Sequence, residues 1–378
     1  MSLSDYTGNG ASKNMSVEAY LNPASPRLDP SPLVDNTKTI QAFIDKTPDG
    51  TLEKPSVIRL PFTPEGFRVD GTINIDNRKH LHIKGPYSQY TVGYGWQLDG
   101  HPCEHMVCTN AQWLIGGTRW VKGQSIRAHW VIDRHAGAGE YSENILLDSV
   151  HVKGYNKRRV ERVISGNNNT LNYAYANYGA ADITRSLEAE HGFSVLGNAK
   201  NISFLHCSAT DTGGDGWIVD VHAANGRNDI SIVGCKSYFA GRHGVGVGDV
   251  DGLVISEFLC KGAASAMLDV EANAPTSRGK NITLRNSSCD VYRIPILIQN
   301  YGQEDITIDG ITILEHGFGS TVWYPIVQAG YVGPGVPLPV GTITVKNVQL
   351  APGIVWDQNT GDTITITNWP NIVVENNV

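Results

Sequence analysis

The chain has 378 residues, a length that suits either two ordinary domains or one long solenoid. Its formal net charge of −7 argues against nucleic acid as a partner, because a surface that binds phosphates should be basic. No apolar run approaches the ~20 residues that a membrane span needs, and the first residues lack the apolar core of a signal peptide.

The N-terminal part predicts an extended arm followed by a short helix. Residues 1–35 are polar and dotted with proline, and Asp35-Asn36-Thr37 then forms a helix N-cap signal. The apolar residues Ile40, Phe43 and Ile44 follow at helical spacing. Strand-like runs come next, at 57–61, 72–75 and 80–83. A helix placed before these strands is expected to cover the open end of a solenoid core.

From about residue 141 one strand motif recurs along the chain. Alternation puts Ile202 and Phe204, and then Ile230 and Ile232, on the inner side of successive strands. The predicted strands of this series are 144–147, 201–204, 229–232, 252–255, 281–284, 305–308 and 342–345. The first step is about twice the others, which predicts an excursion from the coil over about 155–187. We therefore divide the chain into an arm (1–35), a β-helix (36–345) and C-terminal strands or a cap (346–378).

A second strand series carries the strongest functional signal. Three segments nearly repeat, and a fourth continues them without the glycine: His191-Gly192-Phe193-Ser194-Val195, Asp215-Gly216-Trp217-Ile218-Val219, His243-Gly244-Val245-Gly246-Val247 and Ala266-Met267-Leu268-Asp269-Val270. A repeat of about 25 residues with one strand per copy is typical of a solenoid. Because equivalent positions stack ~4.8 Å apart, His191, Asp215 and His243 are expected to form a column.

The cysteines predict no disulfide framework. Cys207 and Cys235 share one register and Cys260 and Cys289 share another, so we expect all four as buried free thiols. The sequence assigns no state to Cys103 or Cys108.

Two groups of segments resemble a known family. Asp35-Asn36-Thr37, Ile58-Arg59-Leu60-Pro61 and the run from Phe67 to Ile73 resemble the opening of pectate-lyase-superfamily β-helix proteins. The stretch from Gly214 through Arg242-His243-Gly244 to Asn273 resembles a subset common in actinobacteria and their phages, although His243 and Ala272 stand where glutamine and proline are common. The resemblance implies an all-β fold, a single right-handed parallel β-helix of about ten coils with an N-terminal capping helix.

Three chemistries of such helices lose support because their motifs are missing. The polygalacturonase pattern is not intact, and neither the calcium-binding carboxylates of pectate lyases nor the DPH triplet of alginate epimerases is present. β-Helices serve as lyases, hydrolases, epimerases and tail proteins, so the fold alone does not assign an activity.

Outward positions on the second strand series predict a carboxylate-flanked groove. Asp220, Asp269 and Glu271 should share one outer face, with Gly246 and Gly248 leaving a hollow between them. Asp269 and Glu271 should lie ~6–7 Å apart and Asp220 and Glu271 ~9–10 Å apart. Such separations fit an inverting glycosidase better than a retaining one.

The candidate residues follow from this groove. Candidate catalytic residues are Asp215, His243, Asp220, Asp269 and Glu271, and candidate substrate-binding residues are His191, Glu190, Arg242, Trp217, Tyr173 and Tyr175. In a lyase, His191 or His243 would be the base and Arg242 the clamp for a uronate carboxylate. We expect no metal and no cofactor, since metal-ligand spacing within one strand is absent.

Structural roles remain open for the same residues. Surface histidines are commonly solvated, Arg242 can pair with Asp215, and Asp269 can bond the amides of the following turn at Asn273 and Ala274. The tyrosines of the excursion suit a subunit contact as well as a lid.

The preferred functional hypothesis is a phage tail protein of tailspike or fibre type, located in the virion tail, that binds a host cell-surface polysaccharide; the sequence leaves open whether it also degrades that polysaccharide. The resemblance implies a homotrimer, and the arm would contact other tail proteins. One alternative is a bacterial polysaccharide lyase or hydrolase acting on a uronate-containing glycan, cytoplasmic or exported without a signal peptide. The other is a structural tail component without chemistry.

Overall fold

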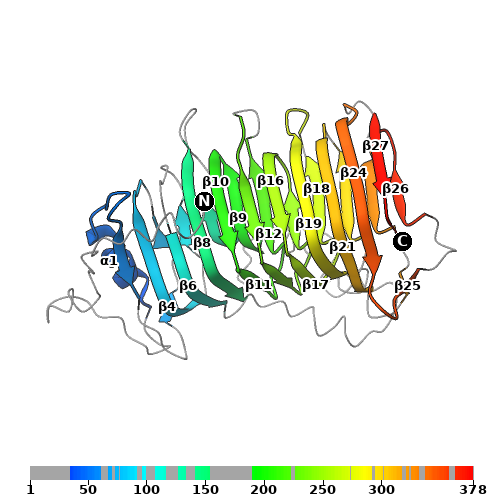
Figure 1. The fold of residues 1–378 in the computed structure, drawn as a ribbon. Helices are drawn as coiled ribbons and strands as arrows, with labels where there is room; N and C mark the ends of the chain where they lie inside the picture. Colours follow the sequence, from blue (N-terminus) through cyan, green and yellow to red (C-terminus); the bar gives the residue numbers. More distant parts are fainter. Residues whose placement is uncertain are drawn as a thin grey trace, which may run out of the picture.

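The computed structural model describes residues 35–60, 67–69, 73–75, 77–91, 96–98, 107–115, 127–132, 141–153, 190–222, 226–272, 274–291, 294–300, 302–316, 321–322, 325–331, 337–356 and 362–377. Within these ranges the chain forms parallel strands wound into an elongated right-handed β-helix, with α1 at one end and β26 and β27 at the other (Figure 1). The predicted fold class is confirmed. The number of coils and the capping role of the helix stay predictions.

Two large parallel sheets form the walls of the β-helix. The fifteen-stranded first sheet contains β1 (Ser56–Arg59), β2 (Phe67–Val69), β4 (Leu81–Thr91), β6 (Val107–Ile115), β8 (Ser142–Lys153), β10 (Ala199–Leu205), β11 (Ser208–Thr210), β13 (Ile230–Val233), β14 (Lys236–Tyr238), β16 (Val250–Ser256), β17 (Leu259–Ala263), β19 (Gly279–Val291), β21 (Glu304–His316), β24 (Val340–Leu350) and β27 (Asn371–Glu375). The long strand β8 pairs with both β10 and β11, so one sheet serves two faces of the coil.

The second sheet has ten strands and carries the candidate site. Its members are β3 (Ile73–Asn74), β5 (Trp96–Leu98), β7 (Arg127–Ile132), β9 (Glu190–Gly197), β12 (Trp217–Val221), β15 (Val245–Val247), β18 (Leu268–Ala272), β20 (Ile296–Asn300), β23 (Val327–Tyr331) and β26 (Ile364–Ile366). A separate pair is formed by β22 (Thr321–Val322) and β25 (Val355–Trp356).

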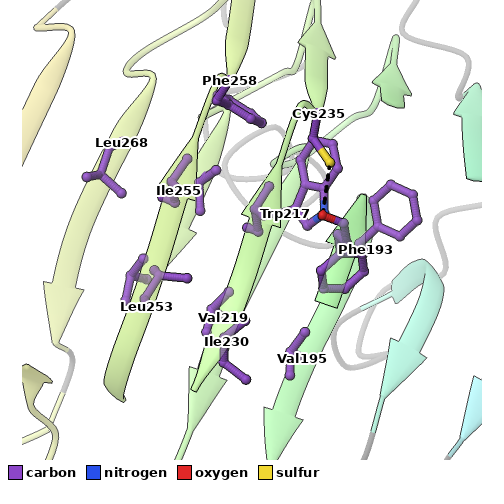
Figure 2. Close-up of a cluster of buried hydrophobic side chains, with 14 of the residues drawn as sticks. Phe193, Val195, Trp217, Val219, Ile230, Cys235, Leu253, Ile255, Phe258 and Leu268 are labelled. Atoms are coloured by element: carbon purple, nitrogen blue, oxygen red, sulfur yellow. Dashed lines mark hydrogen bonds between the residues drawn. The ribbon is translucent and has the colours of Figure 1, made fainter. Parts of the chain in front are cut away.

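The predicted strand registers are confirmed on both sheets. On the first sheet Ile202 pairs with Ile230, which pairs with Leu253. On the second sheet the stack runs through Phe193, Trp217, Val245, Leu268 and Ile296. These side chains are buried and belong to one continuous core (Figure 2). Alternating apolar residues therefore determine both the pairing and the inner face of each strand.

A column of residues in the left-handed backbone region lies at the start of seven strands of the first sheet, β8, β10, β13, β16, β19, β21 and β24. The residues Asn144, Asn201, Asp229, Gly252, Asn281, Asp305 and Gly341 all have positive φ. Asparagine, aspartate and glycine tolerate this backbone region better than other residues. The Asn201 side-chain amide also donates to Asn144 Oδ1, which links two coils.

The Asn201→Ala variant should lower the free energy of unfolding by ~1–2 kcal/mol, because alanine is strained at the φ of 53° that Asn201 adopts. The Asn201→Gly variant is the matched control, since it loses the same side chain but not the backbone preference. Urea unfolding measures both. Equal losses in the two variants would show that the side-chain bond, and not the φ angle, explains the asparagine.

The predicted helix is observed as α1 (Thr37–Lys46), and Ile40, Phe43 and Ile44 are its buried residues. Asp35 rather than Asn36 supplies the cap, since the backbone N–H of Thr37 donates to Asp35 Oδ1 at 3.0 Å. Gln41 forms two hydrogen bonds with the backbone of Asn74 in β3, at 2.8 and 2.9 Å. The helix is thereby fixed against the first strand of the second sheet.

The buried-thiol prediction is confirmed for the four cysteines whose side chains the structure describes. Cys207, Cys235, Cys260 and Cys289 are free and buried. The backbone N–H of Cys207 donates to Cys235 Sγ at 3.3 Å, and Cys260 pairs with Cys289 across β17 and β19. Burial raises the pKa of the Cys260 thiol, so it stays protonated. These thiols fill space in the core as small apolar groups.

Several predictions lie outside the described residues. They are residues 1–34 of the arm, the proposed excursion at about 155–187, Tyr173, Tyr175 and Cys103. Parallel pairing continues past residue 345, since β24 pairs with β27. In the described part of the chain, no helix is long and apolar enough to cross a membrane.

Candidate functional site

The candidate site lies where the chain turns a corner and enters strands β9, β12 and β15. The backbone N–H of Gly192 donates to the carbonyl of Asp215, and that of Gly216 donates to the carbonyl of His243, at 3.0 and 2.9 Å. His191, Asp215 and His243 therefore occupy equivalent positions on three neighbouring coils. The column proposed from the repeat has this arrangement, and the catalytic role assigned to it remains a proposal.

The glycine of each repeat is required by a close approach at this corner. A Cβ on Gly192 would lie 2.6 Å from the carbonyl oxygen of Gly216, and one on Gly244 would lie 2.8 Å from that of Met267. The glycine faces the core, where side chains of the first sheet contact it. The residue before the glycine therefore faces outward, on the same side of the sheet as the outward-facing residues of the strand that follows.

Polar side chains on four successive coils form a continuous row of contacts. His191 Nδ1 lies 3.2 Å from Asp215 Oδ2, and the backbone N–H of His243 donates to Asp215 Oδ1 at 3.0 Å. His243 Nε2 lies 3.1 Å from Asp269 Oδ2. The Gln299 amide then reaches Asp269 Oδ1 at 3.5 Å, which extends the contacts to a fifth coil. We call His191, Asp215, His243 and Asp269 the polar row.

The nitrogen His191 Nδ1 faces two competing partners. The backbone N–H of Asp215 donates to it at 3.1 Å, while the carboxylate oxygen Oδ2 of the same residue lies 3.2 Å away. One ring nitrogen carries either a lone pair or a proton, so it cannot accept from the amide and donate to the carboxylate at once. When Nδ1 accepts, Asp215 Oδ2 has no hydrogen-bond donor within the described ranges. The proton position on His191 is thus coupled to the charge on Asp215.

The two carboxyls of the polar row have pKa values displaced in opposite directions. Burial alone would raise the pKa of Asp215, but the contact with His191 and the charges of His243 and Arg242 outweigh it and lower that pKa. Burial, reinforced by the charges of Glu271 and Asp215, raises the pKa of Asp269 to about 8. The lowered pKa favours the ionised form of Asp215, and the raised pKa favours the protonated form of Asp269. Carboxyls with separated pKa values form acid–base pairs in many active sites.

The polar row is buried, although its residues point away from the core. The exposed fractions are 0% for Asp215, 2% for His191, 3% for Asp269 and 4% for His243. A polymer on the surface of this conformation does not reach these groups. A lyase that uses His191 or His243 as its base, and equally a hydrolase that uses Asp269 as its acid, require the surface over the polar row to open.

The outer positions of the same sheet are more accessible. Asp220 is exposed and Glu271 is half-buried, and the Asp220 carboxyl lies beside Gly248 of the next coil. Packing around its carboxyl raises the pKa of Asp220. Glu271 pairs in register with Gln299 of the next coil. These side chains are placed to form hydrogen bonds with a ligand on the surface.

The hollow predicted at the two glycines is filled by neighbouring side chains. A Cβ on Gly246 would lie 3.0 Å from Asp215 Oδ2, and one on Gly248 would lie 2.6 Å from Asp220 Oδ1. The glycines therefore make room for carboxylates from the preceding coil. On this face a ligand can therefore reach Asp220, Glu271 and the residues beside them.

The remaining candidates fall into three groups. Trp217 is fully buried against Phe193 and is unavailable to a substrate, which corrects its assignment as a binding residue. Arg242 is half-buried and acts electrostatically on both Asp215 and Asp269. Glu190 is the first residue of β9, and only its backbone is described. Tyr173 and Tyr175 lie outside the described residues.

Two polar residues beside the polar row were not among the candidates. Gln299 could have been found, because it lies one coil after Glu271 in the strand series that continues through 295–298. Ser194 is fully buried on the outward side of β9, and its hydroxyl has no hydrogen-bond partner among the residues that the structure describes. Over the described ranges no group of three or more His, Cys, Asp or Glu side chains could hold a metal ion.

Comparison with known proteins supports the fold. No protein-family model and no curated protein sequence matches the chain. The A-module of a mannuronan C-5 epimerase from Azotobacter vinelandii superposes with a TM-score of 0.50 and 11% identity, over 96% of this chain and 97% of that one. At this identity the likeness shows a shared right-handed β-helix fold and does not assign an activity.

Two further solved structures are similar with lower TM-scores. An endo-xylogalacturonan hydrolase from Aspergillus tubingensis has a TM-score of 0.49 and 9% identity, over 86% of this chain and 73% of that one. A tailspike protein of an Escherichia coli O157:H7 bacteriophage has a TM-score of 0.46 and 9% identity, over 83% of this chain and 41% of that one.

Proposed function

We propose that this chain binds a cell-surface glycan on the outer face of its second sheet and cleaves it by hydrolysis. The observation that carries the proposal is the pair Asp269 and Glu271 on one strand, where burial raises the pKa of Asp269 to about 8. Residues two apart on a strand lie ~6–7 Å from each other, within the range of inverting glycosidases. Asp269 would be the general acid, and Glu271 or Asp220 would be the base that activates water.

The biological setting belongs to the same proposal. A glycan-binding β-helix is suited to the virion tail of a phage, where it would recognise the host surface, and residues 1–35 would join it to other tail proteins. Its assembly is a separate question. The sequence resemblance implies a homotrimer.

A second candidate function is favoured by the burial of the polar row. Asp269 is 3% exposed and contacts His243 and Gln299, so contacts within the protein are enough to explain this residue, and no substrate is needed. In this case the chain would be a tail component that binds glycan or virion proteins without cleaving anything. The hydrolase requires instead that the surface over Asp269 opens when glycan binds.

Release of reducing ends from bacterial envelope polysaccharide distinguishes the two functions. The Glu271→Gln and Asp269→Asn variants should each reduce the rate at least ~100-fold, because they remove a proton donor or acceptor. The Asp229→Asn variant is the matched control, since Asp229 is an exposed carboxylate on the first sheet and should leave the rate unchanged. Full activity in both site variants would exclude the site, and glycan binding by the wild type without cleavage would support the structural function.

A further inference from the structure

The first sheet carries a serine–histidine contact that the proposed function does not use. Ser208 of β11 pairs in register with His151 of β8, and the Ser208 hydroxyl oxygen lies 2.9 Å from His151 Nδ1. Both side chains point outward, because Val152 and Ala209, the residues that follow them, are buried in the core. Serine nucleophiles are activated by an imidazole held within hydrogen-bond reach of the hydroxyl.

The protonation state of His151 suits the role of a base. Burial, and then the positive charge of Lys236, lower the pKa of His151, so its ring is neutral at pH 7. A neutral ring with its proton on Nε2 accepts the hydrogen of the Ser208 hydroxyl at Nδ1. The imidazole can therefore take the hydroxyl proton when the oxygen attacks an electrophile.

Lys236 adds a cation on the other side of the serine. It is the register partner of Ser208 on β14, one coil further along, and it is exposed. Strand neighbours lie ~4.8 Å apart, and the Lys236 charge acts on the His151 ring across Ser208. An ammonium group so placed can stabilise the negative oxygen that forms when a hydroxyl attacks a carbonyl.

Another hydroxyl contact on the same sheet shows what a purely structural pair contains. The Ser231 hydroxyl donates to the Ser203 hydroxyl at 2.9 Å, which links two coils. Neither of these groups is a base at neutral pH. Ser208 differs because its partner is a neutral imidazole and because a cation lies in the adjacent register position.

The side chains around Ser208 indicate the class of substrate. Two residues further along the three strands, on the same outer face, lie Lys153, Thr210 and Tyr238. They supply an ammonium group, a hydroxyl and one half-buried aromatic ring. An aromatic ring with polar groups beside it suits a sugar, which has both apolar C–H faces and hydroxyls, better than a lipid chain.

We propose that Ser208, His151 and Lys236 form a second site, which hydrolyses O-acyl esters of sugars. Ser208 Oγ attacks the ester carbonyl carbon while its proton passes to His151. The bond from this carbon to the sugar oxygen then breaks, and the sugar oxygen takes the proton. Water attacks the acyl group on the serine and gives a proton to His151, which returns it to Ser208 Oγ as the carboxylic acid leaves. Water is the one co-reactant.

A fluorophosphonate probe tests the site, because it reacts covalently with activated serine hydroxyls. The full chain should take up one probe, which peptide mass spectrometry should locate on Ser208. The Ser208→Ala variant should take up none, and His151→Gln should react at least ~100-fold more slowly, because the serine has lost its base. The Ser288→Ala variant is the matched control and should react like the wild type. Ser288 continues the same row, but its register partners are Leu259 and Thr312.

Acetate release from glucose pentaacetate measures the reaction itself. The wild type should release acetate at least ~100-fold faster than Ser208→Ala. Equal rates in the two proteins would overturn the proposal, and so would a wild type in which Ser208 takes up no probe. The reducing-end assay of the second sheet is independent of both measurements, since the two sites share no residue.

Discussion

The Trp217→Ala variant should lose ~3–5 kcal/mol of the free energy of unfolding, because it truncates the largest fully buried side chain among the described residues. Trp217 is fully buried between the two sheets. Its ring stacks on Phe193 at 4.9 Å between centroids and meets Phe204 and Phe258 edge-on at 6.4 and 5.5 Å. Alanine leaves a cavity that the three aromatic rings cannot close, because Phe193 and Phe204 are held in β9 and β10 and Phe258 between β16 and β17.

The Trp217→Phe variant is the informative control. The indole N–H of Trp217 is buried and has no hydrogen-bond partner in the described part of the chain, so phenylalanine removes an unpaired donor. It also keeps an aromatic ring against Phe193. Thermal or urea unfolding should therefore show a loss well below that of Trp217→Ala. If both variants lost the same free energy of unfolding, either the indole N–H would have a hydrogen-bond partner or the aromatic ring would not contribute to stability through its packing.

The free energy of unfolding should fall as the pH rises from 6.5 to 8. Burial and the charges of Glu271 and Asp215 raise the pKa of Asp269 from 3.8 to about 8, so the folded state holds a proton that the unfolded state has released. The fall is up to ~1.4 kcal/mol per pH unit, or about 2 kcal/mol over this range. Burial lowers the pKa of His82 to about 4 and raises that of Asp290 to about 6, so both titrate below the range.

Urea unfolding at several pH values checks this dependence. The Asp269→Asn variant mimics the protonated carboxyl, so its unfolding free energy should lack the fall between pH 6.5 and 8. The Asp309→Asn variant is the control, because a bond from Asn347 lowers the pKa of Asp309 and that carboxylate stays ionised throughout. If the wild type and Asp269→Asn share one slope, Asp269 is ionised at neutral pH and cannot be the proposed acid.

The strand registers were predictable because period-two alternation leaves little freedom. A shift of one residue would place Ser203 or Ser231 in the core, and the observed pairing of Ile202 with Ile230 avoids this. The buried thiols followed from the same argument, since Cys207 and Cys235 keep a constant distance from those inner residues. Apolar spacing is therefore a reliable guide wherever one face of a strand is buried.

The burial of the polar row was not predictable from alternation. Alternation identifies which residues point outward, and His191 and Asp215 do point outward, but it does not show what covers them. The prediction of a hollow at Gly246 was wrong for a related reason. The missing side chain leaves space, and the Asp215 side chain of the preceding coil occupies it. Side chains at a corner extend toward the neighbouring coil, and the periodicity of a strand does not predict that direction.

The polar row also has a consequence for how the β-helix unfolds. The stability of a solenoid is approximately a sum of terms for single coils and terms between neighbours, so coils at an end can open alone. The contacts from His191 to Asp269 add side-chain bonds to the backbone pairing between four coils in the middle. Opening one of these coils would leave a buried carboxyl or imidazole of the neighbouring coil without its hydrogen-bond partner. The middle of the chain should thus behave as one cooperative unit, with fraying confined to the coils on either side.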